Sequence, residues 1–289
     1  MKNNHIIKVA QRGDGSFPWY LDTMEGGPEK LYYIGDISLL KEKAVAVVGA
    51  RKCSEYGRQV ALRIGRTLAE NDIVTVSGMA EGIDSFAHIG ALKEGGKTIA
   101  VLGSGINVCY PKSNINIYEK ICDKGLILSE YPPETRPKPW FFPKRNRIIS
   151  AISEAVTVVE ASVDSGSLIT AEIAAEQGKE IIAVPGNITS TYSLGCNKLI
   201  SDGAIIMTVP EDILRTIGIA PKLRREAVML LGDEEREILD ILNKNGEISL
   251  EYLCNILKKE PSKVSGIISV LELKGFISYQ LGKIFIAKF

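Results

Sequence analysis

The chain has 289 residues, of which 45% are hydrophobic and 24% are charged. This length accommodates one large domain and a small one, and it contains enough apolar residues for a sizeable core. The 35 lysines and arginines balance the 35 aspartates and glutamates, which excludes a global attraction to nucleic acid and requires any anion site to be local.

Apolar and polar segments alternate after a polar N-terminal extension, residues 1–42, which is expected to pack on the main domain. Ala44–Gly49 is a continuous apolar run, typical of a strand buried on both faces. Further strands are predicted at Ile73–Ser77, Thr98–Leu102, Gly125–Ser129, Ala155–Glu160 and Glu180–Val184. Helical spacing predicts helices at Tyr56–Asn71, Ile83–Lys93, Arg147–Ile152, Ser167–Gln177 and Glu211–Ile217. The alternation predicts an α/β domain, residues 43–219, with an extended Rossmann-like parallel sheet covered by helices.

The C-terminal part has a different pattern, which predicts a linker at residues 220–231 and a small domain at residues 232–289. Three helices are expected, at Glu234–Leu242, Leu250–Leu257 and Pro261–Leu273. A hairpin is expected to follow, with strands at Gly275–Tyr279 and Lys283–Ala287 and a turn at Leu281-Gly282. Three helices and a hairpin are typical of a winged-helix domain. Because its third helix carries few cations, packing or partner binding is favoured over reading duplex DNA.

Familiar catalytic and cofactor-binding motifs are incomplete in this sequence. The first strand ends in Gly49-Ala-Arg-Lys, without the second and third glycines of the dinucleotide motif G-x-G-x-x-G. The stretch Gly-Gly-Lys-Thr at 95–98 resembles the end of a phosphate-binding P-loop, but Ala91 stands where its first glycine is required. No G-x-S-x-G motif occurs, and the two histidines, His5 and His88, suggest no metal cluster. We therefore expect no enzymatic activity, no cofactor and no metal.

The N-terminal residues and the cysteines bear on the cellular compartment. Residues 1–15 are polar, and no apolar run approaches the roughly 18 residues of a membrane span. The five cysteines lie far apart and form no Cys-x-x-Cys pair, as expected for free thiols in a reducing environment. These features predict a cytoplasmic protein without a membrane segment.

Polar turns that contain glycine follow five of the predicted strands. In an open parallel sheet, ligands bind at the carboxyl ends of the strands, and glycine lets backbone N–H groups approach an anion. A single turn is weak support, because ordinary strand–helix connections also need glycine, but five at one sheet edge predict an anion-binding rim. The candidate residues of these turns are Gly49, Arg51, Ser77, Gly78, Gly103, Gly105, Ser165, Gly166, Ser167 and Asn187.

The stretch FFPKRNR at 141–147 combines two aromatic rings with three cations and an amide. A single-stranded nucleic acid needs cations for its phosphates and flat rings or hydrogen-bonding groups for its bases. The alternative is a helix N-terminus with a solvated basic face and Phe142 in the core. From the residues alone, both interpretations stay open. The candidates in this stretch are Phe141, Phe142, Lys144, Arg145, Asn146 and Arg147.

Together these motifs resemble the DprA/Smf family of DNA-processing proteins. The stretches that carry the resemblance include VGAR at 48–51, SGMAEGID at 77–84, FPKRNRII at 142–149, SGSLITA at 165–171 and PGN at 185–187. They lie in the family's order and spacing over residues 17–208, and the C-terminal unit also fits the family. The resemblance implies a homodimer that binds single-stranded DNA in a pocket of the Rossmann-like domain. It also implies that the protein helps to load the RecA recombinase in natural transformation and homologous recombination.

The resemblance also assigns roles to individual residues. Arg51, Lys112 and Lys138 are expected to contact phosphate, and Phe141 or Phe142 to stack on a base or shield it. Arg145 and Arg147 are expected to bind phosphate or to brace the pocket through ion pairs, for which Asp84 and Glu160 are the expected acids. The turn residues that would line the pocket are Ser77, Gly78, Ser165, Gly166, Ser167 and Asn187, and Thr170 belongs to the same expected site.

Two positions depart from the family's pattern. Ala50 stands where Ser or Thr is common, and Glu81 stands where Arg is common, which reverses a charge near the expected groove.

Rival functions follow from related folds. The main rival is a phosphoribohydrolase, but its Pro-Gly-Gly-x-Gly-Thr signature is missing after Glu160. Two further rivals are a nucleotide-binding protein without catalysis and a duplex-DNA regulator that acts through the winged helix.

Overall fold

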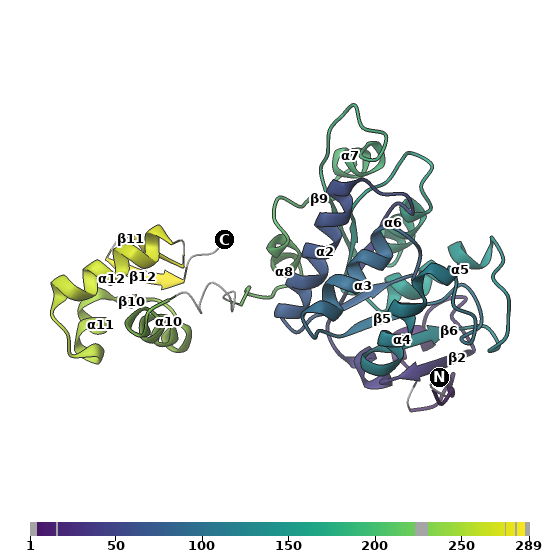
Figure 1. Cartoon of the computed structure of the whole chain (residues 1–289), viewed down its shortest axis with the longest axis horizontal. Helices are drawn as coiled ribbons and strands as arrows, with labels where there is room; N and C mark the ends of the chain where they lie inside the picture. The colour runs from purple at the N-terminus through teal and green to yellow at the C-terminus, as the bar shows by residue number, and fades with distance from the viewer. Residues whose placement is uncertain (1–4, 16, 223–230, 275, 281, 287–289) are drawn as a thin grey trace. The chain divides into compact units, whose positions relative to one another are not determined.

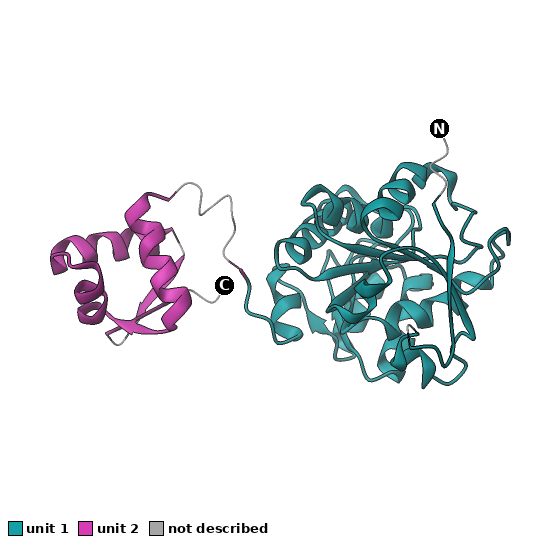
Figure 2. Cartoon of the chain, turned by 90° about the horizontal axis from the view of Figure 1, so that it is seen from below, with its two compact units in different colours: residues 1–221 teal, residues 222–289 magenta. Residues whose placement is uncertain are grey.

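The computed structural model describes residues 5–15, 17–222, 231–274, 276–280 and 282–286. The chain divides into two compact units, Met1–Pro221 and Lys222–Phe289, which are coloured separately in Figure 2. The expected linker at 220–231 falls at this division, and its residues 223–230 lie outside the described part of the chain. Each unit is therefore considered by itself.

The first unit is built on a nine-stranded sheet with the order β1-β2-β6-β5-β4-β3-β7-β8-β9. Its strands are β1 (Lys8–Gln11), β2 (Lys30–Gly35), β3 (Ala44–Val48), β4 (Val74–Ser77), β5 (Thr98–Val101), β6 (Leu126–Ser129), β7 (Ala155–Val158), β8 (Glu180–Ala183) and β9 (Ile205–Ile206). The strands from β3 to β9 run parallel, with Ala46 of β3 opposite Val76 on one side and Val156 on the other. Every residue of β3 is buried, as its apolar sequence predicts for a central strand. The α/β class with a Rossmann-like sheet is confirmed.

The N-terminal extension differs from the expectation, because it forms part of the sheet instead of only packing on it. Strand β2 pairs antiparallel with β6, placing Tyr33 opposite Leu128, and β1 pairs antiparallel with β2. The sheet is therefore mostly parallel, with an antiparallel edge. The four-residue strand β1 buries only Ala10, which is too little alternation for the sequence pattern to identify.

Helices cover both faces of this sheet. They are α1 (Trp19–Asp22), α2 (Glu55–Glu70), α3 (Ile83–Lys93), α4 (Ile115–Lys124), α5 (Phe141–Ala151), α6 (Gly166–Glu176), α7 (Leu194–Ser201) and α8 (Glu211–Thr216), with 3₁₀ turns η1 (Ile37–Lys41) and η2 (Lys112–Asn114). Helices α2 and α3 pack with Val45 and Val47 of β3 on one face (Figure 1), whereas α5 and α6 pack with Ala46 and Val48 on the other. Helix α5 begins six residues earlier than predicted, because Pro143 is tolerated in the first turn of a helix.

The described part of the second unit contains three helices, α10 (Asp233–Asn245), α11 (Leu250–Leu257) and α12 (Pro261–Leu273). Strands β10 (Ile248–Ser249), β12 (Lys283–Ile286) and β11 (Ile277–Gln280) form an antiparallel sheet in that order. The helices enclose an apolar core that includes Ile238, Leu253 and Ile268. This is the arrangement expected of a winged helix, with β10 as an additional strand. Gly275, Leu281 and Ala287 of the expected hairpin lie outside the described residues.

The strand order places a crevice at the centre of the first unit. From β3 the chain proceeds outward through β4, β5 and β6, and then returns to form β7 on the opposite side of β3. Ligands of open α/β sheets bind where the strand order reverses in this way, at the carboxyl ends of the strands. The turns that follow β3 and β7 therefore occupy the expected binding position. None of the described helices has the length and apolar character needed to span a membrane.

Candidate nucleic-acid interface

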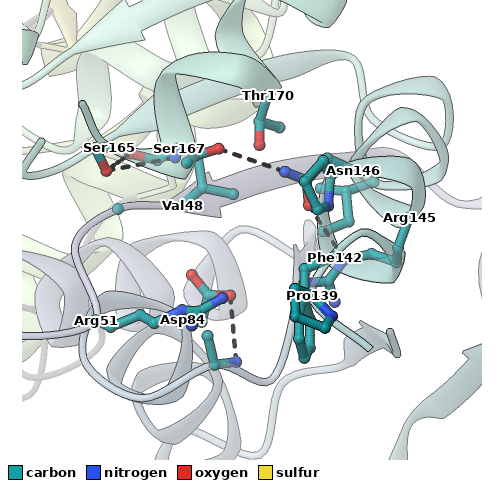
Figure 3. A pocket seen from close by; sticks show the side chains of 15 residues that line it. Val48, Arg51, Asp84, Pro139, Phe142, Arg145, Asn146, Ser165, Ser167 and Thr170 are labelled. Carbon is teal, nitrogen blue, oxygen red and sulfur yellow. Dashed lines mark hydrogen bonds between the residues drawn. The ribbon is translucent and has the colours of Figure 1, made fainter. Parts of the chain in front are cut away.

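A cavity of about 250 Å³ lies at the carboxyl ends of β3 and β7 (Figure 3). It is lined by residues from the turns after β3, β4 and β7, from the proline-rich loop, and from helices α5 and α6. These residues are Val48, Gly49, Arg51, Ala80, Asp84, Pro139, Phe142, Pro143, Arg145, Asn146, Ile149, Ser165, Gly166, Ser167 and Thr170. Nine of the predicted site residues are among them, contributed by three separate stretches of the sequence.

Arg51 is the exposed cation of this cavity. It follows β3 directly, and its Cζ atom lies 5.2 Å from the centroid of the Phe142 ring. The face of an aromatic ring attracts a guanidinium and holds it in place without using its hydrogen-bond donors. Within the described chain, no carboxylate forms an ion pair with Arg51, so these donors are free for a phosphate.

The N-terminus of α6 contributes hydroxyl groups and backbone N–H groups. The Ser165 hydroxyl accepts a hydrogen bond from the backbone N–H of Ser167 at 3.4 Å, and the two serine hydroxyls lie 2.7 Å apart. Gly166 is the first residue of the helix, and a Cβ atom there would meet nothing within 4 Å. The side-chain amide of Asn146 donates to the Gly166 carbonyl at 3.4 Å (Figure 3). Such a helix start carries partial positive charge and favours an anion.

Arg145 lines the cavity but is directed into the protein. It is 4% exposed, and its Nη1 atom donates to the carbonyl oxygens of Gly78, at 2.7 Å, and Val101. Burial lowers the pKa of Arg145 to about 10, an effect that the nearby Asp84 opposes. Arg145 braces the turn after β4 through backbone carbonyls and not through the expected ion pair, and its expected phosphate contact stays a prediction.

The two acids that were expected to brace the arginines have different partners. The Oδ2 atom of Asp84 accepts from the backbone N–H groups of Gly78, at 3.1 Å, and Ala80, at 3.3 Å. Burial raises the pKa of Asp84, while the charge of Arg145 opposes this rise. Glu160 instead accepts from the backbone N–H and the hydroxyl of Ser54, so it holds the start of α2 and not an arginine.

The two neighbouring phenylalanines have different surroundings. Phe142 supports Arg51 and lines the cavity, whereas Phe141 stacks on Tyr131 with ring centroids 4.0 Å apart. The ammonium group of the exposed Lys138 lies 5.6 Å from the centroids of both Phe141 and Trp140. The structure thus favours Phe142 over Phe141 as the residue that faces a bound base.

The remaining cations of the 141–147 stretch contact Glu130. The Arg147 Nη2 atom lies 2.7 Å from a Glu130 carboxylate oxygen, and the Lys144 Nζ atom lies 3.5 Å from the same oxygen. The Arg147 side chain is 15% exposed and the Lys144 side chain is 54% exposed. Arg147 therefore braces the loop after β6, as one of its two expected roles implied, and neither residue lines the cavity.

Several predicted site residues support the rim without lining this cavity. The Ser77 hydroxyl donates to the Val47 carbonyl at 2.6 Å, in the interior of the sheet. Gly103 lies against the Phe142 ring, where a Cβ atom would be 2.6 Å from Cδ1, and Gly105 lies against the carbonyl of Pro132. These residues position the walls of the cavity, and their expected direct contact with a ligand stays a prediction.

Asn187 and Lys112 also lie outside the cavity. The Asn187 side-chain oxygen accepts from the backbone N–H and the hydroxyl of Thr189 within its own turn. Lys112 is exposed at the first position of η2, next to Pro111. Neither Lys112 nor Lys138 lines the cavity, and both are exposed on loops.

A second cavity, of about 60 Å³, shares Arg51, Ala80 and Phe142 with the first. Its lining also includes Gly78, Glu81, Tyr110 and Pro111. Sequence reasoning missed Tyr110 as a site residue. A tyrosine that precedes a proline in the loop after β5 was the available signal, but its proximity to Phe142 becomes visible only in three dimensions.

Comparisons with known proteins agree with this architecture. The family model described as "DNA recombination-mediator protein A" matches residues 8–218. The DNA processing protein DprA of Streptococcus pneumoniae is 46% identical over 201 residues, which cover 70% of this chain and 71% of the relative. The DNA processing protein DprA of Bacillus subtilis is 41% identical over 202 residues, which cover 70% and 68%, respectively.

Solved structures show the same relationship. The DNA processing protein A of Streptococcus pneumoniae superposes with a TM-score of 0.70 at 42% identity, covering 75% of each chain. The corresponding protein of Helicobacter pylori superposes with a TM-score of 0.68 at 30% identity, covering 75% of this chain and 98% of the other. That structure was described for the single-stranded DNA binding mode of the Helicobacter protein.

The family match covers well over half of the chain and lies within the first structural unit. It contains β3, the turn that carries Arg51, and the start of α6, so it includes every residue that lines the main cavity. The resemblance inferred from the motifs is confirmed. The chain belongs to the DNA recombination-mediator protein A family, the DprA/Smf proteins that act in DNA processing and recombination.

Proposed function

We propose that this protein acts by binding single-stranded DNA, not by catalysis, at the edge of the sheet where β3 and β7 end. The observation that carries the proposal is the pairing of Arg51 with Phe142, opposite the start of α6. A free guanidinium and the N–H groups of a helix start suit phosphate, and an aromatic ring that lines the cavity suits a base. The binding mode described for the Helicobacter relative supports the same assignment.

The proposed contacts follow from the position of each residue. Arg51 and the Ser165–Ser167 turn hold a phosphate, and Phe142 lies beside the attached base. Lys112 and Lys138, which are exposed on loops outside the cavity, hold the phosphates on either side. A cavity of about 250 Å³ accepts an unstacked nucleotide but no duplex, so we expect a preference for single strands.

A gel-shift comparison of oligo-dT with duplex DNA tests this proposal. The wild type is expected to bind the single strand more tightly, and Arg51→Ala is expected to weaken that binding by roughly tenfold through the loss of a charge-assisted phosphate contact. Lys52→Ala is the matched control, because Lys52 is an exposed cation next to Arg51 but lines neither cavity. Equal affinity for both DNA forms would contradict the proposal. Release of a base from a nucleoside monophosphate would instead support the phosphoribohydrolase alternative.

We also propose that the protein works in the cytoplasm as a homodimer that helps to load RecA onto single-stranded DNA. Its membership of a family of recombination mediators supports this assignment. Light scattering of the purified protein tests dimerisation. ATP hydrolysis by RecA on DNA coated with a single-strand-binding protein tests loading, with Arg51→Ala as the variant that should not stimulate it. A monomeric protein that leaves the RecA activity unchanged would contradict this part of the proposal.

A further inference from the structure

The second cavity contains a carboxylate, which is an unusual group beside a phosphate-binding arginine. Glu81 lines this cavity together with Arg51, Tyr110 and Phe142. The rings of Tyr110 and Phe142 have centroids 5.7 Å apart and planes 33° apart, and Tyr110 is 46% exposed. The exposed ring of Tyr110, next to Phe142, offers an apolar face on which a base can stack.

Glu81 keeps much of its hydrogen-bonding capacity free. Its Oε1 atom accepts a hydrogen bond from the Ser113 hydroxyl at 2.9 Å. Its Oε2 atom has no hydrogen bond or ion pair within the described chain, and no ion pair joins Glu81 to Arg51. An ionised carboxylate has about four acceptor sites, so Glu81, which lines this cavity, retains acceptor capacity for a ligand.

The loop that carries Glu81 is held from several directions. The side-chain amide of Asn114 donates to the carbonyl oxygens of Met79, at 2.9 Å, and Ala80, at 3.1 Å. Gly82 has a φ of +73°, and a Cβ atom there would lie 2.3 Å from the Ala50 carbonyl oxygen. The backbone at Glu81 is therefore fixed against the turn that carries Arg51, which lowers the entropic cost of using the carboxylate in binding.

The charge of Glu81 determines which part of a DNA strand it can contact. A carboxylate repels phosphate and needs hydrogen-bond donors. Guanine presents two adjacent donors, N1–H and the N2 amino group, to the two oxygens of a carboxylate. Adenine and cytosine present one amino group beside an acceptor nitrogen, and thymine presents one N–H between two carbonyl oxygens. Guanine is thus the base that matches Glu81.

We propose that the second cavity binds the edge of a guanine base and that Glu81 is the specificity-determining residue. Arg51 holds the adjoining phosphate, and Tyr110 and Phe142 contact the face of the base. This inference rests on the proposed function, because it concerns the same bound strand. It gives the proposed DNA-binding site a base preference that originates in one side chain.

Fluorescence anisotropy with a short oligo-dT that carries a single central guanine tests this assignment. We expect the wild type to bind this strand roughly tenfold more tightly than plain oligo-dT, as is usual for a bidentate contact to a base. Replacing guanine by hypoxanthine, which lacks the N2 amino group, is expected to remove most of the gain. Strands with a central adenine or cytosine are expected to lie between guanine and thymine.

Variants then assign the preference to Glu81. Glu81→Gln is expected to abolish the guanine preference and to raise the affinity for plain oligo-dT, because a negative charge near phosphate is lost. Glu119→Gln is the matched control, since Glu119 is an exposed carboxylate on α4 that lines neither cavity.

The outcomes separate this inference from the proposed function. Binding of oligo-dT without any guanine preference in the wild type, or an unchanged preference in Glu81→Gln, would overturn the role of Glu81 alone. Absence of binding to every single strand would overturn the proposed function and this inference together.

Discussion

The guanidinium of Arg145, on helix α5, donates a hydrogen bond to the carbonyl oxygen of Gly78, in the turn after β4, across 2.7 Å. This bond joins the helix that carries Phe142 to the loop that carries Glu81 and leads into α3. Because Arg145 is almost fully buried, the bond forms in a low-dielectric interior, where hydrogen bonds are stronger than in water. The two walls of the binding site are therefore tied together from inside the protein.

Gly78→Ala is expected to disrupt this tie. An added Cβ atom would lie 2.3 Å from Nη2 of Arg145, and overpacking of this kind costs about 2 kcal/mol of unfolding free energy. Urea denaturation measures the loss. Gly166→Ala is the control, because its Cβ atom would meet nothing within 4 Å. Equal stability of the two variants would show that Arg145 moves aside without cost.

Two neighbouring phenylalanines are expected to differ in their roles: Phe142→Ala should weaken DNA binding, whereas Phe141→Ala should mainly reduce stability. Phe142→Ala removes the ring beneath Arg51, and the affinity for oligo-dT should fall by roughly tenfold, the effect of losing a stacking side chain. Phe141→Ala removes the stack on Tyr131 and should mainly lower the melting temperature. Anisotropy titrations and thermal melts of both variants check this division, and similar effects on both quantities would refute it.

The salt dependence of DNA binding is expected to report the phosphate contact of Arg51. For single strands, the slope of the logarithm of the affinity against the logarithm of the salt concentration changes by about 0.7 for each neutralised phosphate. Arg51→Ala should reduce the slope by about this amount, whereas Lys52→Ala should leave it unchanged. Titrations at several salt concentrations measure both slopes. An unchanged slope in Arg51→Ala would mean that another group neutralises the phosphate.

The free energy of unfolding is expected to fall as the pH is lowered, because the buried His88 resists protonation in the folded state. Burial, together with the charge of Arg145, lowers the pKa of His88 to about 3. The Thr98 hydroxyl donates to the Thr75 carbonyl, so His88 Nδ1 must donate to Thr98, and its buried Nε2 atom has no partner. A proton on Nε2 would therefore be a buried, unpaired charge.

The direction of this pH effect follows from the difference in the pKa of His88 between the folded and the unfolded chain. The unfolded chain, with an ordinary histidine pKa near 6.5, binds the proton more readily than the folded chain, so stability decreases as the pH falls from about 6.5 towards 3. Between pH 7 and pH 5 the loss amounts to about 2 kcal/mol. Urea titrations at both pH values measure it. His88→Gln should remove this loss and His5→Gln should retain it, and a loss that persists in His88→Gln would point to carboxylates.

The sequence was sufficient to predict the parallel strands β3 to β8 and helices α2, α3, α5, α6 and α8 of the first unit, but not strands β1, β2 and β9 or helices α1, α4 and α7. A continuous apolar run such as Ala44–Val48 fits few structures other than a strand buried on both faces. The boundaries of α3, α11 and α12 were predicted to the residue. The edge strand β1 was missed because most of its side chains face solvent, so its sequence lacks a buried periodicity.

The turns that form the candidate site were predicted from the sequence. The directions in which their side chains point were not. Arg51, Arg145 and Arg147 cannot be told apart by residue type. Nevertheless, Arg145 contacts Gly78 and Arg147 contacts Glu130, both of which are distant in sequence. Such contacts depend on how α5 packs against the sheet, which local patterns do not encode. The same limit concealed the proximity of Tyr110 to Phe142.

The hydrogen bonds between Ser54 and Glu160 span 106 positions in the chain and join the segments that follow β3 and β7. Arg51 lies on the first of these segments, and the Ser165–Ser167 turn lies on the second. A nascent or truncated chain that ends before β7 therefore has the cation but not the hydroxyl groups that complete the cavity. Formation of the proposed DNA-binding cavity therefore requires a chain that extends through β7 and the start of α6.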